Sequence, residues 1–287
     1  MVAQEKQKIL KENLIEFQKR LDIAKKQKIL TAIELAKEIS ESENAFDLLK
    51  SIESLLSSDE EAMLLSELCK TELRSKIKAM LFIGSTEPTK AGAHSKISFV
   101  KNKYNDIAFE EFSRSGINAK PDYASSFKDS CESVYDGRCE FCILPLTNSN
   151  DGRMMSFYAL IERYELKICN YTEIEDEASG SLRLALLSRS CKEPNEKKPD
   201  SQNYVFEFSV NAERTDFISE LLLAASALGA ELLSVDSIPV EYALGMQKFF
   251  FAFNISVKEL LAFRLYVALK NQSYVPIGIY QNKNQQT

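Results

Sequence analysis

Cysteine and histidine are the side chains that most often hold a metal or carry redox chemistry in a protein. Cys139 and Cys142 form a C-x-x-C pair, a spacing found in zinc and redox sites. No second pair of this kind accompanies them, and His94 is the only histidine among 287 residues. We therefore interpret both cysteines as buried structural thiols, and we expect no metal, no other cofactor and no histidine-dependent catalytic triad.

Net charge and hydrophobic patterning argue against two further classes of function. Acidic residues outnumber basic ones by 42 to 36, and the formal net charge is -6. A chain of this charge offers no global basic field to a nucleic-acid backbone or to an acidic membrane surface. No apolar run approaches the roughly 18 residues of a membrane-spanning helix, and the charged first residues do not resemble a secretion signal. We expect a cytoplasmic protein without nucleic-acid or membrane partners.

The helices and strands predicted along the chain form three segments, and any functional site must be built on them. The first segment is helical. Residues 3–82 contain no Gly and no Pro, and apolar residues recur at steps of three and four, which predicts a helical domain over residues 1–83. The first predicted helix carries an apolar stripe of Leu10, Leu14, Phe17, Leu21 and Ala24. Further helical turns are predicted over 33–39 and 45–56. Ser58 and Glu61 form a capping box that predicts a last helix reaching Ile77.

The other two segments are of mixed type. After a linker with Gly and Pro at residues 84–95, short helices and strands alternate over residues 96–190, which predicts an α/β domain with a parallel sheet. A charged linker at residues 191–203 with two prolines leads to a third domain over residues 203–284. Its predicted elements follow the order βαββαβ, which is the ferredoxin-like arrangement.

The middle segment contains the stretch VYDGRCEFCILPLTNSNDGRMMSFYALIERYELKI. It resembles the signature of prephenate dehydratases, in which a buried strand leads into a Pro-x-Glu-Asn-Ser turn, a glycine and a helix. Asn148, Ser149 and Gly152 match this turn, whereas Thr147 stands at the family's glutamate. The βαββαβ segment then resembles the ACT regulatory domain that follows the dehydratase, with SVDSIPV (residues 234–240) in place of a Glu-Ser-Arg-Pro strand.

Beside these two domains, the helical segment resembles the helical type of chorismate mutase, which precedes dehydratase and ACT domains in bifunctional enzymes. Lys11 and Lys28 hold the positions of two arginines of that family. The resemblance implies that both are catalytic cations that clamp the carboxylates of chorismate, although a lysine lacks the bidentate fork of an arginine. From the charge pattern alone, both are surface residues of a highly charged helix.

Two departures from the dehydratase pattern imply that its active site is lost. In the family, the substrate lies between two lobes, and the chain of the second lobe precedes a returning strand with a Thr-Arg-Phe motif. Here only ten residues, 172–181, precede the returning strand, which is too few for a lobe. The motif is Leu-Arg-Leu at residues 182–184, so the catalytic hydroxyl is absent. The resemblance leaves three ligand-binding candidates in this domain: Asn148, Ser149 and Arg183.

The ACT-like segment also departs from its family. There, amino-acid effectors contact a Gly-Ala-Leu segment at the first helix and the Glu-Ser-Arg-Pro strand. In this chain Asp216 stands in the first place and Asp236 and Ser237 stand in the second, so the family's glycine and arginine are absent. The resemblance makes these three residues the ligand-binding candidates of the third domain.

These observations predict a non-catalytic relative of the chorismate mutase/prephenate dehydratase family in aromatic amino acid (phenylalanine) metabolism. We expect a homodimer, held by the helical and ACT-like domains, that binds a partner enzyme or a small molecule such as chorismate, prephenate or an aromatic amino acid. One alternative is a surviving chorismate mutase that uses Lys11 and Lys28. Another is a structural helical dimer with an appended scaffold.

Overall fold

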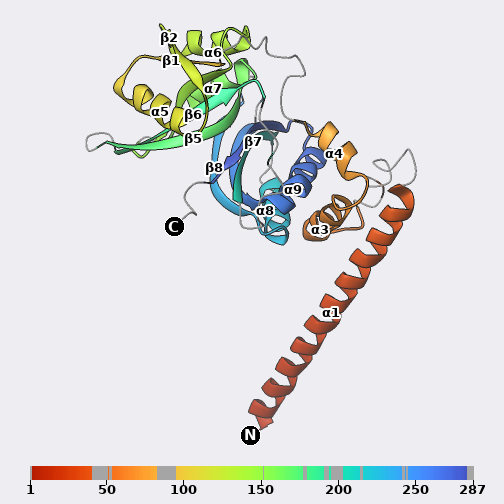
Figure 1. Cartoon of the computed structure of the whole chain (residues 1–287). Coiled ribbons are helices and arrows are strands. Elements are labelled where there is room, and N and C mark those ends of the chain that lie inside the picture. Colours follow the sequence, from red (N-terminus) through yellow and green to blue (C-terminus); the bar gives the residue numbers. More distant parts are fainter. Residues whose placement is uncertain are drawn as a thin grey trace. The chain divides into compact units, whose positions relative to one another are not determined.

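The computed structural model of the chain describes residues 2–40, 51, 54–82, 95–150, 152–176, 180–190, 194, 203–213, 216–240, 243 and 245–282 (Figure 1). Nearly all of both predicted linkers and most of the helix predicted over 45–56 lie outside these residues. The chain divides into two compact units. The helical unit comprises Met1–Met80, Asp216–Gly229 and Leu261–Lys270, and the sheet unit comprises Leu81–Thr215, Ala230–Leu260 and Asn271–Thr287. The three predicted domain ranges stay a prediction.

The helical unit contains α1 (Val2–Ser40), α3 (Ser58–Leu68), α4 (Arg74–Met80), α8 (Asp216–Ala227) and most of α9 (Val257–Lys270). The helix α1 is continuous over 39 residues, so the turns predicted over 33–39 belong to the first helix. Within this unit, α3 packs against α1 and α8.

Two details of α3 differ from the prediction. Its capping box is formed by Ser57 and Glu60 rather than Ser58 and Glu61, because Ser57 has the extended backbone that an N-cap requires. The Ser57 N–H donates to Glu60 Oε2 at 2.9 Å. The predicted last helix is also divided into α3 and α4. Near the division the Thr71 hydroxyl donates to the Leu68 carbonyl at 2.7 Å, competing with the helical backbone for that acceptor.

The sheet unit is built on one continuous sheet. Its strands are β1 (Ser95–Val100), β2 (Ala119–Ala124), β3 (Phe141–Asn148), β4 (Gly152–Arg153), β5 (Lys167–Asp176), β6 (Gly180–Ser188), β7 (Asn203–Ala212), β8 (Glu231–Pro239), β9 (Gln247–Ser256) and β10 (Val275–Gln281). They lie in the order β2-β1-β3-β6-β5-β10-β7-β9-β8, with β4 paired to β3.

The prediction of a parallel sheet over residues 96–190 is wrong. The strand β1 is parallel to β2 and to β3, but β6 is antiparallel to both β3 and β5. The cause is a hairpin: only residues 177–179 separate the end of β5 from the start of β6. A connection this short cannot carry the crossover that a parallel pair needs, so the second strand must return antiparallel.

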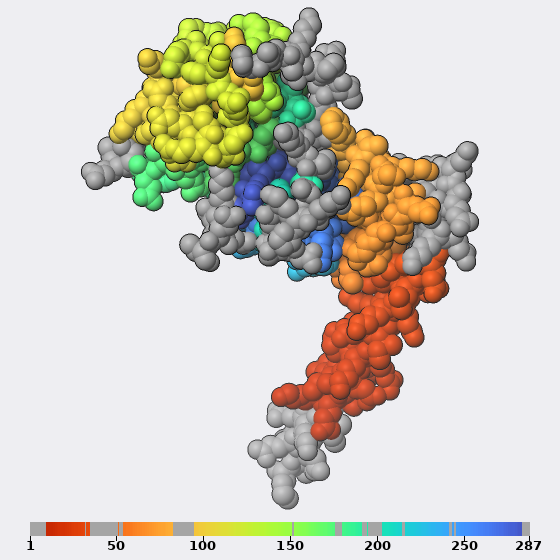
Figure 2. Space-filling model, viewed as in Figure 1, coloured from red at the N-terminus to blue at the C-terminus, as the bar shows by residue number. Residues whose placement is uncertain are grey.

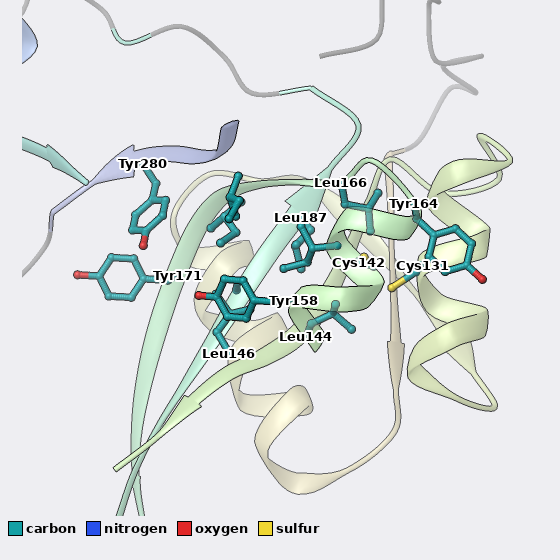
Figure 3. Packing of buried hydrophobic residues seen from close by; sticks show 14 of the residues in the cluster. Cys131, Cys142, Leu144, Leu146, Tyr158, Tyr164, Leu166, Tyr171, Leu187 and Tyr280 are labelled. Atoms are coloured by element: carbon teal, nitrogen blue, oxygen red, sulfur yellow. The ribbon is translucent and has the colours of Figure 1, made fainter. Parts of the chain in front are cut away.

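Helices cover both faces of the first half of the sheet. The side chains of α6 (Phe127–Tyr135) and α7 (Met155–Arg163) share one core with Cys142, Leu144 and Leu146 of β3 (Figure 3). The helix α5 (Lys103–Arg114) packs on the opposite face, against a core that includes Ile143. Two of these helices, α5 and α6, start at side-chain caps, Asn102 and Ser126.

The predicted burial of the two cysteines is confirmed, since Cys139 and Cys142 are both buried. Burial, together with the nearby Asp122 carboxylate, raises the pKa of the Cys139 thiol to about 11. Burial also raises the pKa of the Cys142 thiol, so both thiols stay protonated at neutral pH and are poor nucleophiles.

The second half of the sheet follows the predicted order β7-α8-β8-β9-α9-β10 along the chain. Its strands are arranged β10-β7-β9-β8, and all neighbours are antiparallel. The consecutive phenylalanines at residues 249–251 are all buried, so both faces of β9 are covered.

A glycine joins the two halves. The strand β10 is antiparallel to β7 and parallel to β5, with Gly278 opposite Ile168. A Cβ atom at residue 278 would lie 2.7 Å from both the Cβ and the carbonyl oxygen of Ile168, closer than real atoms approach. Only glycine allows this pairing without a shift of the backbone. The sheet is thus continuous across the linker predicted at residues 191–203.

Candidate functional site

A pocket of about 590 Å³ lies in the sheet unit, where β3 to β6 and α7 face β7, β8 and β9. Its charged lining consists of Arg153, Arg183, Glu207, Glu231 and Asp236. Its aromatic and apolar lining consists of Tyr158, Tyr171, Val205, Leu233 and Ala252. This volume lies within the usual range of small-molecule sites, about 300–1,000 Å³.

The turn that matched the dehydratase signature positions Arg153. The Asn148 side chain accepts a hydrogen bond from the Asn150 N–H at 3.0 Å, and Gly152 has a φ of 71°, which favours glycine. The chain thereby turns back, and Gly152 and Arg153 form β4 beside the end of β3. The position of Arg153 is thus set by backbone geometry as well as by its own contacts.

Arg153 is held from several sides, and its side chain is 6% exposed. Its Nε lies 3.0 Å from Asp236 Oδ2, and its Nη2 donates to Ser234 Oγ at 2.8 Å. The guanidinium carbon lies 4.8 Å from the centre of the Tyr158 ring. The remaining nitrogen, Nη1, is shielded from solvent and has no hydrogen-bond partner among the described residues. Burial alone would lower the pKa of Arg153, but Tyr158, Glu207 and Asp236 outweigh it and raise the pKa.

A buried carboxylate lies beside this arginine. Glu207 of β7 is 2% exposed, and its two oxygens accept hydrogen bonds from Tyr158, at 3.0 Å, and from Tyr280. Burial and the adjacent Glu207 raise the pKa of both tyrosine hydroxyls well above 10. The two tyrosines, both labelled in Figure 3, therefore remain neutral donors across the physiological range.

The second guanidinium, that of Arg183 on β6, already has a partner. Its Nε and Nη2 both donate to Glu173 Oε1, at 2.9 and 2.6 Å, across the β5–β6 pair. Its carbon lies 4.8 Å from the centre of the Tyr171 ring. The positive charge of Arg183 is therefore largely balanced before any ligand enters.

The wall opposite Arg183 comes from β8. A bulge between Leu232 and Ser234 changes the side to which alternate residues point, so that both Leu233 and Ser234 line the pocket. The amide side chains of Asn254 and Asn282 also line the pocket, and Asn282 donates to Asn254 Oδ1 at 3.0 Å.

The contacts of Ser234 bear on whether its hydroxyl could act as a nucleophile. The Ser234 hydroxyl accepts from a guanidinium, which cannot take up its proton, so the hydroxyl is not activated as a nucleophile. No cluster of three His, Cys, Asp or Glu side chains that could hold a metal occurs among the described residues.

Of the ligand-binding candidates, the structure brings Arg183 and Asp236 together in the pocket. Asn148 and Ser149 instead shape the neighbouring turn, where Ser149 exchanges two hydrogen bonds with the Ser181 backbone, at 2.9 and 3.0 Å. Ser237 is exposed and, as the residue next to Asp236 on a strand, points to the opposite face. Asp216 is the first residue of α8, in the helical unit.

The two catalytic candidates lie on α1. Seventeen helical residues span roughly 26 Å, so Lys11 and Lys28 of one chain cannot clamp one small dicarboxylate. Lys28 Nζ lies 2.9 Å from Glu60 Oε2 and is already paired with that carboxylate. A clamp that combines lysines from two chains stays a prediction.

Sequence reasoning missed Arg153, Tyr158, Glu207 and Tyr280. One signal was present: Glu207 is the only charged residue in the strand sequence YVFEFSV (204–210), where a buried carboxylate requires partners. Nothing comparable marked Arg153, whose surroundings come from β8 and β9.

Comparison with known proteins relates the chain to others by structure alone. No family model matches the sequence, and no curated protein matches it. Among solved structures, prephenate dehydratase from Streptococcus mutans matches with a TM-score of 0.53 and 16% identity, over 65% of this chain and 98% of that chain. The described chain has a prephenate-dehydratase-like fold.

Two further structures support this fold. Prephenate dehydratase from Arthrobacter aurescens in complex with L-Phe gives a TM-score of 0.53 and 12% identity, over 67% of this chain and 91% of that chain. GqqA, a quorum quenching acylase, gives a TM-score of 0.52 and 19% identity, over 67% of this chain and 98% of that chain. Because the prephenate-dehydratase-like fold is shared by proteins with different activities, it does not decide function. Among the described helices, none is long and apolar enough to cross a membrane.

Proposed function

We propose that this protein is a non-catalytic, metabolite-binding relative of prephenate dehydratase that acts in aromatic amino acid metabolism. The observation that carries the proposal is the β5–β6 hairpin, in which residues 177–179 stand where the resemblance places a second lobe. Without that lobe, the cleft that would enclose prephenate has one wall. The 590 Å³ pocket beside Arg153 and Glu207 is then the candidate ligand site.

The same proposal assigns a family resemblance to the two remaining parts of the chain, the last four strands and the N-terminal helices. The strand arrangement β10-β7-β9-β8 is that of a ferredoxin-like fold and supports an ACT-like domain. The α1, α3 and α4 helices are proposed to form a degenerate chorismate-mutase-like domain.

A homodimer through α1 is part of this function. Four apolar side chains of the predicted stripe, Leu10, Leu14, Phe17 and Leu21, are each more than half exposed on α1. Most of this helix is the red part of Figure 2. A stripe spaced in steps of three and four suits a parallel or antiparallel partner helix, such as α1 of a second copy. Light scattering of the full chain should give a dimer mass, and Phe17→Glu should reduce it to that of a monomer. A wild-type monomer would contradict the assembly.

An activity assay tests the proposal. Purified full-length protein, incubated with prephenate, should form phenylpyruvate no faster than the buffer does, while a working prephenate dehydratase under the same conditions serves as the positive control. Turnover well above background would overturn the non-catalytic assignment.

The enzyme alternative, a surviving chorismate mutase, is tested in parallel. It predicts chorismate rearrangement that Lys28→Ala abolishes while the circular dichroism spectrum stays unchanged. If the wild-type chain rearranges no chorismate, this alternative is excluded.

A further inference from the structure

We infer that α1 pairs with α1 of a second copy in antiparallel orientation, in a register that keeps Lys11 of one copy away from Lys28 of the other. The inference rests on the homodimer of the proposed function and adds the orientation and register of its two helices. It follows from the place where α3 contacts α1 and from the side chains on either side of the apolar stripe.

The apolar stripe is open to a partner over residues 10–21. Its four apolar side chains are 51–68% exposed. Further along the helix, Lys28 Nζ lies 2.9 Å from Glu60 Oε2, and Lys25 Nζ lies 3.9 Å from Asp59 Oδ2. The helix α3 therefore lies against α1 from residue 25 onward, and a second helix has free access only before that point.

The spacing of the stripe is that of a coiled-coil seam. Residues 10, 14, 17 and 21 follow one another at steps of four, three and four, as the a and d positions of heptads do. Ile15, Ile23 and Leu30 are also at least half exposed, but they recur only about once in two turns. They form no continuous seam, so the stripe is the surface that a partner helix would cover.

The charges beside the seam disfavour a parallel pair. In a parallel coiled coil, a residue at a g position faces the e position five residues further along the other helix. Arg20 would then face Lys25 of the second copy, and the symmetric contact would repeat this repulsion. A parallel pair would also place both α3 helices at the same level beside the seam, where each lies against residues 25–28 of its own chain.

An antiparallel pair centred between residues 15 and 16 avoids both problems. Leu10 then lies beside Leu21 of the second copy, and Leu14 lies beside Phe17, so the four exposed apolar side chains cover one another. Removal of this apolar surface from water favours the pairing. The two α3 helices come to lie at opposite ends of the seam.

The flanking residues fit this register. In an antiparallel pair, e positions face e positions and g positions face g positions. Lys11 therefore faces Gln18 of the second copy, and Arg20 faces Asn13, so each cation meets a neutral amide.

An antiparallel pair shifted by one heptad fits less well. It would set Arg20 against Arg20 and Lys11 against Lys25, and it would place Leu10 beside Lys28. Like charges brought together at an interface repel, and an apolar side chain would be left against a cation. The unshifted register is thus the one that the sequence of the seam favours.

The register has a consequence for the chorismate mutase alternative. Lys11 lies level with residue 20 of the second copy, and eight helical residues, about 12 Å, separate that level from Lys28. The shifted pair would instead bring Lys11 level with residue 27, next to Lys28. A clamp built from lysines of two chains therefore needs the register that the flanking charges disfavour.

The substitution Gln18→Glu tests orientation and register together. The measurement is the dissociation constant of the full-length dimer, from sedimentation equilibrium. In the inferred pair the new carboxylate faces Lys11 of the second copy twice per dimer, and we expect about fivefold tighter association. In a parallel pair it faces Asn13, and the constant stays the same. In the shifted pair it faces its own counterpart, and the dimer weakens. Either of the last two results would overturn the inference.

A matched control separates this contact from the change in net charge. Lys19→Gln alters the charge of the chain by the same amount, but residue 19 lies on the side of α1 opposite the seam. We expect its dissociation constant to stay within about twofold of the wild-type value. Tightening as large as that of Gln18→Glu would attribute the effect to net charge and overturn the inference.

Asn13→Glu provides a second test on the other flank. Its carboxylate should face Arg20 of the second copy and again tighten the dimer by about fivefold. In a parallel or a shifted pair it would face Gln18 or Gln27, so an unchanged constant would contradict the register.

The outcomes separate this inference from the proposed homodimer. A wild-type monomer, or a dimer that Phe17→Glu leaves intact, would overturn the α1 homodimer and this inference together. A dimer that Phe17→Glu dissociates but Gln18→Glu fails to tighten would keep the homodimer and overturn only its orientation and register.

Discussion

The pocket and the contact between α1 and α3 both pair cations with carboxylates, but they do so in different surroundings. In the pocket, the side chain of Arg153 is 6% exposed, and Glu207 beside it is buried with two tyrosine donors. At the contact of α1 with α3 the exposure is reversed: the cation Lys28 is 46% exposed, and its partner Glu60 is 5% exposed. The family resemblance pointed to the solvated lysine, whereas burial and convergent contacts single out an arginine that no motif marked.

The comparison shows that a residue at a family's motif position need not lie in the pocket that the fold forms. An ion pair whose cation is exposed contributes little, because water competes for the exposed charge. A buried pair constrains its neighbours, since removal of one partner leaves the others desolvated. The following predictions test whether substitutions in the two regions change the free energy of unfolding by different amounts.

The largest effect is expected at Glu207. Glu207→Ala removes the acceptor of Tyr158 and Tyr280 and leaves a cavity among buried polar groups. We expect a loss of about 3–5 kcal/mol in the free energy of unfolding. Urea denaturation followed by circular dichroism measures it. Glu207→Gln keeps one acceptor oxygen and should lower the free energy of unfolding by less. If the alanine variant loses less than about 1 kcal/mol, the pocket and the α1–α3 contact do not differ in their contribution to stability.

An intermediate effect is expected at alkaline pH. Because the folded protein raises the pKa of Tyr158 and Tyr280 well above 10, their stabilisation is complete below pH 10 and falls as the pH rises above that value. The loss should approach roughly 1 kcal/mol per tyrosine for each pH unit above 10. Thermal unfolding between pH 9 and pH 11 measures it. Tyr280→Phe should show a shallower alkaline decline, and an identical decline would contradict the role of this hydroxyl.

The smallest effect is expected at Lys28. Lys28→Ala breaks its ion pair with Glu60, and the free energy of unfolding should fall by less than about 1 kcal/mol. The same denaturation experiment applies, with Lys11→Ala as the matched loss of a lysine from α1. A loss comparable to that of Glu207→Ala would show that the α1–α3 pair carries more of the fold than its exposure implies.

Much of the local structure was predictable because its signals are local. Ser126 and Gly137 bracket α6, and the alternating apolar segments after residue 203 predicted four strands and two helices in the observed order. The strand β2 was not predicted, because its sequence AKPDYA contains a proline and mostly exposed side chains, as suits the edge of a sheet.

The candidate site was less predictable, because its parts are brought together by pairings distant in sequence. The contacts that hold Arg153 come from Asp236 and Ser234, more than 80 residues away in the chain. The hydrogen bonds to Glu207 come from Tyr158 and Tyr280, which are also distant in sequence. Arg183 and Asp236 were found because a family pattern named their positions, not because their own neighbours in sequence marked them.

The central position of β10, the strand that contains Gly278, affects how the sheet is completed during folding. The strand β10 is the last described strand along the chain, yet it lies between β5 and β7 in the middle of the sheet. Until it inserts, β5 and β7 both present open edges, which are prone to pairing with other chains. A chain shortened before residue 275 should therefore aggregate rather than form a smaller soluble protein, and insertion of β10 is expected to be the slow step that closes the pocket.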